Sequence, residues 1–187
     1  ISSDKLHLGC GWKHVKGWLN CDVTGSDIDL DLASPPFPFA DGQFSVIVAQ
    51  QVVEHLDYDP VLLNLLRELH RILKPGGRVW LSCPDLEIIC RSYCQDRCAA
   101  IDKGRKRHWP HGEEPGFPVQ HRINYYFHHQ GEHRNLYDLE MLEWALGYAG
   151  FKDVRRVDEG AFYREHPDFP VREMKETHDS LILTALR

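Results

Sequence analysis

The sequence predicts an α/β fold in which helices cover a layered sheet. Two observations lead to this prediction. Short apolar runs alternate along the chain with amphipathic helical patterns, which is typical of α/β proteins. The run 44–49 is continuously apolar, as expected of a central parallel strand that is buried on both faces. No internal repeat or domain boundary is visible, so we expect one domain over residues 1–187.

Seven short segments are expected to form the strands. The segment 12–17 joins the first two, and it is too short for the crossover helix that usually links parallel strands. The run 33–39 contains three prolines and cannot form regular structure, because proline lacks a backbone donor. A polar excursion joins the last two strands. The expected strands are 5–8, 18–21, 28–32, 44–49, 78–83, 151–157 and 180–186.

Three helices are predicted from apolar spacing and from the residues at their ends. Asp59 and Pro60 are expected to begin the first helix, with Asp59 as its N-cap. The last helix is expected over 138–149 and ends at Gly150. One apolar face of the first helix holds Leu62, Leu65, Leu66, Leu69, Ile72 and Leu73, and the core candidates of the last are Leu142, Trp144 and Leu146.

The middle helix, which opens at 84–85, carries three regularly spaced cysteines. Cys90, Cys94 and Cys98 follow C-x3-C-x3-C, which is one residue longer than the C-x3-C-x2-C pattern of radical enzymes. We interpret them as small buried hydrophobes on the apolar face of the helix. All six cysteines of the chain lie in or beside expected strands and helices. This placement favours reduced thiols and a cytoplasmic location over a disulfide framework.

Charge and hydropathy restrict the class of partner. The formal charge of −6 argues against nucleic acid as the main partner. No apolar run approaches the roughly 20 residues that a membrane span requires, so we expect no membrane partner. No signal peptide is visible, although the chain begins at Ile1 rather than Met, which leaves an upstream segment open.

Periodicity fails between residues 103 and 136. This segment is rich in histidines and aromatics and is long for a structureless connection, so we expect a lid over a functional site. His129 and His133 are four residues apart, a spacing that suits zinc on a helix, but Gly131 lies between them. The sequence therefore predicts no metal site. His133 and Arg134 are instead expected to reach the substrate from the lid.

The stretch 6–11 ends the first strand with two glycines. Gly9 and Gly11 lack Cβ atoms, so they can adopt positive φ and let a ligand approach the backbone closely. Asp22 follows at the end of the second strand. A glycine turn after one strand and an acid after the next suit a nucleoside, because the acid can accept hydrogen bonds from ribose hydroxyls.

Several motifs together resemble class I S-adenosylmethionine-dependent methyltransferases of the type 11-like, small-molecule branch. The stretch 6–11 is similar to the first motif of that family. Asp31, together with the segment 38–44, resembles the part of the family that contacts adenine. The segments 53–56 and 69–78 resemble those around its fourth and fifth strands. The resemblance implies a Rossmann-like three-layer sandwich, with a mostly parallel six- to seven-stranded sheet and an antiparallel last strand.

The resemblance also implies S-adenosyl-L-methionine as the cofactor. Asp22 is expected to bind the ribose, and Asp31 with Leu32 to bracket the adenine. Gln50 and Gln51 stand where the family often has Ser-His, so no catalytic histidine is carried over to position 51. The residues expected at the cofactor are Leu8, Gly9, Cys10, Gly11, Asp22, Val23, Asp31, Leu32, Gln50 and Gln51.

The implied function is methyl transfer to a small-molecule acceptor, directed at oxygen or nitrogen. Displacement at a sulfonium mainly requires positioning, but an oxygen or nitrogen nucleophile must also lose a proton. His55, after the fourth strand, and His133, in the expected lid, are the candidates for this catalytic step. His55 is equally consistent with a capping or surface histidine.

Two other classes stay open at this point. The same fold can hold S-adenosylmethionine or S-adenosylhomocysteine without turnover, or support a partner, because Gln50 and Gln51 leave no assured base. An NAD-dependent dehydrogenase also uses a glycine turn. It requires G-x-G-x-x-G, however, and His14 stands at the position of the third glycine.

Overall fold

The computed structural model describes residues 3–99, 101, 118–169 and 179–187. Its strands form one sheet in the order β3-β2-β1-β4-β5-β7-β6. The first five pair in parallel, and β7 runs antiparallel between β5 and β6. This confirms the predicted α/β fold and its antiparallel last strand. The strands are β1 (Lys5–Leu8), β2 (Leu19–Asp22), β3 (Ile28–Asp29), β4 (Phe44–Gln50), β5 (Leu73–Pro84), β6 (Lys152–Arg156) and β7 (Ser180–Leu186).

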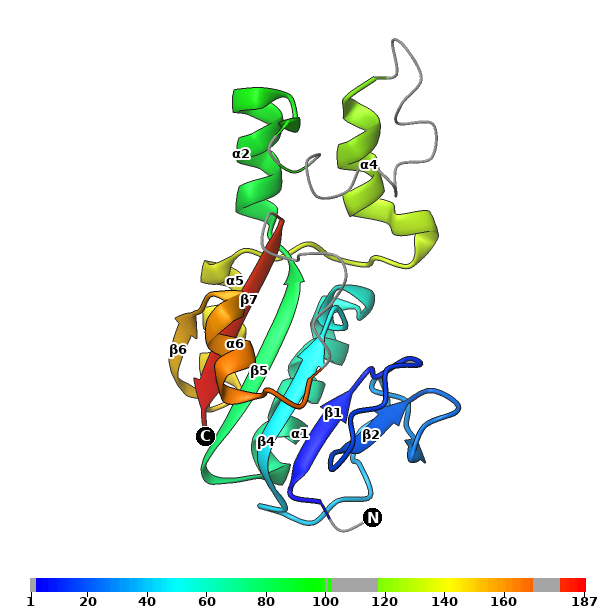
Figure 1. Ribbon diagram of the computed structural model, residues 1–187, viewed down its shortest axis with the longest axis vertical. Helices are drawn as coiled ribbons and strands as arrows, with labels where there is room; N and C mark the ends of the chain where they lie inside the picture. The colour runs from blue at the N-terminus through cyan, green and yellow to red at the C-terminus, as the bar shows by residue number, and fades with distance from the viewer. Residues whose placement is uncertain (1–2, 100, 102–117, 170–178) are drawn as a thin grey trace.

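Helices cover both faces of the sheet and one of its ends. In Figure 1, α1 and α5 lie behind the sheet, α6 lies in front, and α2 and α4 stand beyond the carboxyl end of β5. No helix among the described residues has the length and apolar character that crossing a membrane requires. The helices are η1 (Val53–His55), η2 (Tyr58–Leu62), α1 (Leu63–Ile72), α2 (Leu86–Asp96), α4 (Gln120–His128), η3 (His129–Gly131), α5 (Leu139–Tyr148) and α6 (Glu159–Glu165).

The main core lies between the sheet and the pair α1 and α5. Ile47 and Ala49 of β4 point into it, while Val46 and Val48 belong to a separate core on the other face. This is the two-residue alternation of a strand that is buried on both sides. The residues of the expected apolar face of the first helix are all buried, but they do not all lie on one helix. Leu65, Leu66, Leu69 and Ile72 belong to α1, whereas Leu62 ends η2 and Leu73 begins β5.

Several local predictions about the helices are wrong. Asp59 has extended backbone angles, and neither η2 nor α1 receives a side-chain cap. Trp144 is 55% exposed and stacks on Tyr148 at the surface. Cys90 and Cys94 are exposed, and only Cys98 is buried, so the three thiols do not share one buried face. The reason is that α2 ends at Asp96, and Arg97 and Cys98 both have positive φ, so Cys98 does not continue the helix face that carries Cys90 and Cys94.

The segment expected as a lid is partly helical. Residues 102–117 lie outside the described part of the chain. The following residues form α4 and η3 where no periodicity was expected, and α4 packs on α2 through a small cluster that includes Ile89 and Tyr126. The Tyr126 hydroxyl donates to Asp179 Oδ2 at 2.5 Å and so ties α4 to the start of β7.

The link between β1 and β2 contains no helix, as its length predicts. β1 and β2 are nevertheless parallel, with Leu6 opposite Leu19. The face that a crossover helix would cover is filled instead by α6 and the residues after it. Trp18 Nε1 donates to Asp168 Oδ2 at 2.9 Å, and the second core holds Val15, Trp18, Val46, Val48, Trp80, Phe162 and Phe169. The sequence analysis treated α6 as a polar excursion and so missed this helix.

His166 is buried against this second core. It makes edge contacts with the rings of Trp18 and Trp80, and its Nε2 atom has no hydrogen-bond partner among the residues that the structure describes. Burial lowers the pKa of His166 below its usual value. The unfolded chain therefore takes up this proton first as the pH falls, so the contribution of His166 to stability is present above about pH 6.5 and is lost on acidification.

We predict that His166→Phe weakens the loss of stability on acidification, because the titrating group is removed while a ring remains. Urea unfolding at pH 7.5 and 5.5 measures this loss. The control is Phe162→Leu, which removes packing from the same core and should lower the free energy of unfolding equally at both pH values. An identical acid-induced loss in His166→Phe and the unmodified chain would contradict the assignment.

Candidate functional site

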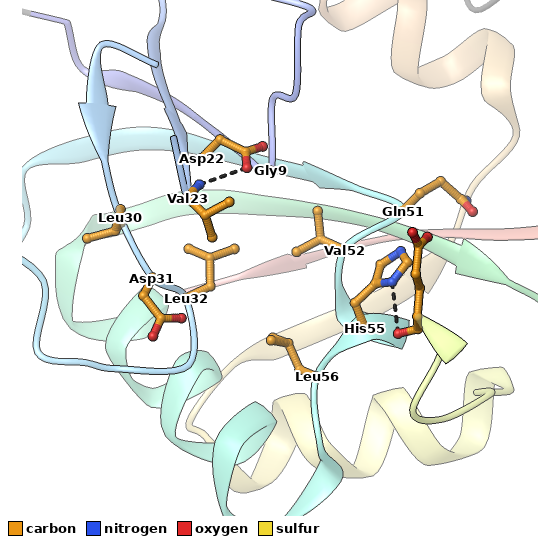
Figure 2. Close-up of a pocket in the computed structure, with 11 residues that line it drawn as sticks. Gly9, Asp22, Val23, Leu30, Asp31, Leu32, Gln51, Val52, His55 and Leu56 are labelled. Atoms are coloured by element: carbon orange, nitrogen blue, oxygen red, sulfur yellow. Dashed lines mark hydrogen bonds between the residues drawn. The ribbon is translucent and has the colours of Figure 1, made fainter. Parts of the chain in front are cut away.

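A pocket of about 470 Å³ opens at the carboxyl ends of β1 to β4 (Figure 2). The sheet order reverses here, because β2 and β3 lie on one side of β1 and β4 lies on the other. Ligands of open α/β sheets bind at such a switch point. The residues that line the pocket are Gly9, Asp22, Val23, Leu30, Asp31, Leu32, Gln51, Val52, His55, Leu56 and Glu132.

Gly9 meets the chain that leaves β4. Its φ of +63° lies in the left-handed region, and a Cβ atom placed on it would lie 2.3 Å from Val52 Cγ2. Glycine is therefore required here both by backbone angle and by space. Gly11 also has a positive φ, of +52°, but a Cβ atom there would have no neighbour within 4 Å.

The carboxylate of Asp22 joins the ends of β1 and β2. Its Oδ2 accepts a hydrogen bond from the N–H of Gly11, and its Oδ1 accepts one from the N–H of Val23, both at 2.7 Å. Each carboxylate oxygen has two acceptor positions, so both oxygens retain capacity for a further donor. Asp22 therefore fixes the glycine turn and still presents an acceptor to the pocket.

Asp31 is committed to its own turn. Its oxygens accept from the Ala33 N–H at 2.9 Å and the Ser34 hydroxyl at 2.8 Å. The Ala33 N–H, with the Ser34 hydroxyl, holds the pKa of the Asp31 carboxyl below its usual range. An ionised acid at this rim stands beside the apolar wall formed by Val23, Leu30, Leu32, Val52 and Leu56.

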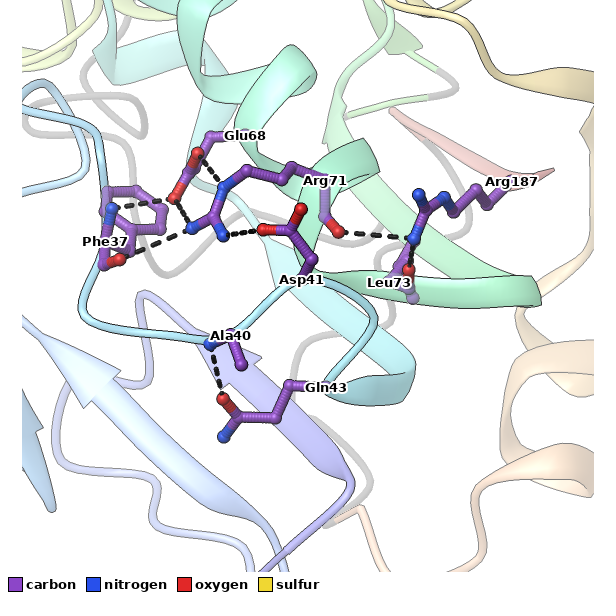
Figure 3. A network of polar contacts seen from close by, with 8 residues as sticks. All are labelled: Phe37, Ala40, Asp41, Gln43, Glu68, Arg71, Leu73 and Arg187. Atoms are coloured by element: carbon purple, nitrogen blue, oxygen red, sulfur yellow. Dashed lines mark hydrogen bonds and ion pairs between the residues drawn. The ribbon is translucent and has the colours of Figure 1, made fainter.

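A network of charged groups holds the loop after Leu32 against α1 (Figure 3). Glu68 accepts the N–H of Phe37 at 2.7 Å and two donors of Arg71. Arg71 also pairs with Asp41, at 2.5 Å. Glu68 is only 7% exposed, so these bonds satisfy a carboxylate that burial would otherwise disfavour. The network fixes the loop that carries Asp31 and Leu32 to the pocket.

Two histidines meet at the other end of the pocket. His55 Nδ1 lies 3.1 Å from the Glu132 carbonyl oxygen, and His133 Nδ1 lies 2.6 Å from that of Tyr126. A carbonyl oxygen only accepts, so both Nδ1 atoms carry a hydrogen, and in the neutral form of either ring the lone pair is on Nε2. Burial lowers the pKa of His133 to about 4, which keeps its ring neutral at pH 7. The two ring centroids are 5.0 Å apart.

The structure brings most of the expected site residues to this pocket, but four of them do not line it. Leu8 and Cys10 are buried behind the turn, and burial raises the pKa of the Cys10 thiol to about 11. Gly11 and Gln50 are neighbours of lining residues. The lining residues that the sequence analysis named are Gly9, Asp22, Val23, Asp31, Leu32, Gln51 and His55, and His133 stands next to His55.

Four lining residues were not among the expected site residues: Leu30, which directly precedes Asp31, and Val52, Leu56 and Glu132. Val52 and Leu56 flank the Glu54-His55 pair, so their apolar character next to that motif was a usable signal. Glu132 reaches the pocket from the segment after α4, far along the chain from the strand ends. No local pattern could place it there.

The strand order, with its switch point between β1 and β4, and the glycine turn define a class I S-adenosylmethionine-dependent methyltransferase. A family model described as "Methyltransferase domain" matches residues 7–156, which is most of the chain. The chain therefore belongs to this methyltransferase family, it is an enzyme, and its cofactor is S-adenosyl-L-methionine. No curated protein sequence matches it.

Solved structures of methyltransferases share the fold at low sequence identity. An S-adenosylmethionine-dependent methyltransferase from Mesorhizobium loti has a TM-score of 0.54 at 19% identity, over 98% of this chain and 90% of that one. One from Archaeoglobus fulgidus has 0.55 at 14%, over 98% and 85%. Phosphoethanolamine N-methyltransferase 2 of Haemonchus contortus, in complex with S-adenosyl-L-methionine, has 0.53 at 13%, over 98% and 48%. These likenesses confirm the Rossmann-like fold.

We predict that alanine at Gly9 is more damaging than alanine at Gly11. Gly11→Ala is strained by its backbone angle alone, at a cost of about 1 kcal/mol. Gly9→Ala adds the clash with Val52, for a total of about 2–4 kcal/mol. Urea unfolding measures both. The double change Gly9→Ala with Val52→Ala should recover part of the difference, and equal losses at the two glycines would contradict the close approach.

Proposed function

We propose that the chain transfers the methyl group of S-adenosylmethionine to a small-molecule acceptor, through attack by oxygen or nitrogen. The observation that carries the proposal is the pair of Nε2 lone pairs on His55 and His133. They stand at the end of the pocket opposite Asp31 and Leu32 (Figure 2 shows His55). An acceptor hydroxyl or amine must lose a proton on methylation, and a neutral histidine can take it.

In this proposal the cofactor lies across the carboxyl ends of β1 to β4. Asp22 accepts hydrogen bonds from the ribose hydroxyls, and the backbone at Gly9 allows close approach. Asp31, Leu32 and Val23 border the adenine, and Gln51 lies between the nucleoside and the histidines. Of the remaining expected residues, Leu8 and Cys10 support the turn from behind, Gly11 belongs to the turn itself, and Gln50 ends β4 beside Gln51.

A small acceptor fits the charge and shape of the molecule better than a nucleic acid. The formal charge is −6, which disfavours a phosphate backbone. The segment after α4 supplies Glu132 to the pocket, so we assign the expected lid a role at the acceptor end. One structure of similar fold is described as a phosphoethanolamine N-methyltransferase and another as a possible histamine N-methyltransferase. All six cysteines are free, in line with a reducing, cytoplasmic setting.

Release of S-adenosylhomocysteine tests this function directly. The chain is incubated with S-adenosylmethionine and, separately, with hydroxylated small molecules, small amines, a peptide mixture and a folded RNA. We expect release only with a small hydroxyl or amine compound, and mass spectrometry should find one added methyl group on it. His55→Gln should lower kcat by at least 100-fold, with the exposed His128→Gln as the control.

Two outcomes would contradict the proposal. Methylation of the peptide or RNA alone would show that the acceptor is a macromolecule and not a small molecule. Tight binding of S-adenosylmethionine with no turnover on any acceptor would favour the non-catalytic alternative.

We predict that Asp22→Asn lowers the affinity for S-adenosylmethionine at least tenfold. A hydrogen bond to a charged acceptor contributes about 1.5–3 kcal/mol, and 1.4 kcal/mol is a factor of ten. Calorimetry measures the affinity, and thermal unfolding shows that the variant is folded. Asp29→Asn is the matched control, because Asp29 pairs with Asp22 across β2 and β3 but does not line the pocket. Unchanged affinity in Asp22→Asn would remove Asp22 from the ribose site.

A further inference from the structure

Three side chains with metal-binding atoms converge beside the acceptor end of the pocket. They are Glu54, His55 and His133, and their ligand atoms all lie within 4.8 Å of one another. Two come from η1, and the third follows η3, so the fold brings them together from distant parts of the sequence. The sequence predicted no metal site, and its pair of histidines with a zinc-like spacing, His129 and His133, is not the set that the fold brings together.

The two imidazoles already have the tautomer that ligation requires. Each Nδ1–H donates to a backbone carbonyl, that of Glu132 for His55 and that of Tyr126 for His133. Each Nε2 is left as the atom with the lone pair. Histidines that bind metals usually make this second hydrogen bond, because it fixes the orientation of the ring and raises its basicity.

Backbone contacts hold the two contributing segments against each other. The N–H groups of Arg134 and Asn135 donate to the Glu54 carbonyl oxygen at 2.8 and 3.2 Å. The Asn135 side chain donates to the Leu56 carbonyl oxygen at 2.8 Å. His133 is therefore placed next to η1 by three hydrogen bonds that do not involve any of the ligand atoms. The two segments are therefore held together without a cation.

The third side chain adds charge and an oxygen ligand. Glu54 is fully buried, and a carboxylate in such a position is suited to a divalent cation. Zinc bonds of about 2.0–2.2 Å in a tetrahedral arrangement place ligand atoms about 3.3 Å apart. The present separations of up to 4.8 Å need to close by no more than about 1.5 Å, within the reach of side-chain rotation.

We propose that Glu54, His55 and His133 bind a divalent cation of the zinc class. Two imidazole nitrogens and one carboxylate form a donor set that zinc and its neighbours in the first transition row accept. Three protein ligands leave a fourth position open, and His55 itself lines the pocket. The Nε2 lone pair of His55 can bind either the cation or a proton, but not both at once. His55 therefore acts as a base only in the form of the protein that holds no cation.

Zinc titration of the metal-free chain tests this proposal. The full chain is stripped with a chelator, dialysed, and titrated with Zn²⁺ against a chromophoric competitor at pH 7.5. We expect one equivalent to bind, and His133→Ala, His55→Ala and Glu54→Gln each to lower the affinity at least tenfold. The control is His128→Ala, which removes an exposed histidine of α4 outside the set and should leave the affinity unchanged.

Substitution with Co²⁺ supplies a second readout, because a four-coordinate cobalt site absorbs strongly in the visible range. The three ligand variants should lose this absorption, and His128→Ala should keep it. Zinc affinity that is the same in all four variants would overturn the proposal, as would the absence of one bound equivalent. Calorimetry with S-adenosylmethionine on the metal-free chain tests cofactor binding separately from zinc binding. Asp22 lies outside the metal set, so a failure to bind zinc would leave cofactor binding unchanged. Circular dichroism identifies a variant that has unfolded, and Glu54→Gln then replaces it as the informative change.

Discussion

The Asp22 carboxylate, which accepts from Gly11 on one side and Val23 on the other, is the contact around which the site is built. β1 and β2 are joined without a helix, and their ends are also held by the parallel pairing of Leu8 with Cys21 and by a bond from the Cys10 N–H to the Cys21 carbonyl oxygen. A charge-assisted hydrogen bond of this length is among the stronger polar contacts in proteins. It holds the turn at which Gly9 meets Val52 from the far side of the switch point. The pocket forms where the ends of β1, β2 and β4 are held in register.

Because no helix connects β1 and β2, a segment from later in the chain covers the face of the sheet beside them. The face of β1 and β4 that a crossover helix would cover is covered instead by residues after α6, where Phe169 packs on His7 and Trp18. Asp168 accepts from Trp18 and pairs with Lys5, so the segment after α6 fastens directly to the first two strands. On the opposite face, Glu68 and Arg71 fasten the loop after β3 to α1. The end of the pocket that holds Asp22 and Asp31 is therefore fixed by contacts on both faces of the sheet.

The sequence predicted the sheet well because apolar runs and glycine or acid residues at strand ends are local signals. β7 was placed at its observed bounds, and the missing crossover helix followed from the count of residues alone. The predictions from sequence were wrong or absent where tertiary contacts decide which side chains are buried and which distant segments meet. Trp144 has helical core spacing but faces outward, and α6 has too few apolar positions to be recognised before its aromatic partners are known. Glu132 and the meeting of Glu54 with His133 depend on how α4 returns to the sheet.

A crystal structure of the chain with S-adenosylhomocysteine would show directly whether Asp22 holds the ribose. We expect both ribose hydroxyls to donate to Asp22 while its bonds to Gly11 and Val23 persist. The adenine should lie against Leu32, and the sulfur should point toward His55. A ribose bound away from Asp22, or a turn at Gly9 that opens to admit the nucleoside, would contradict this expectation.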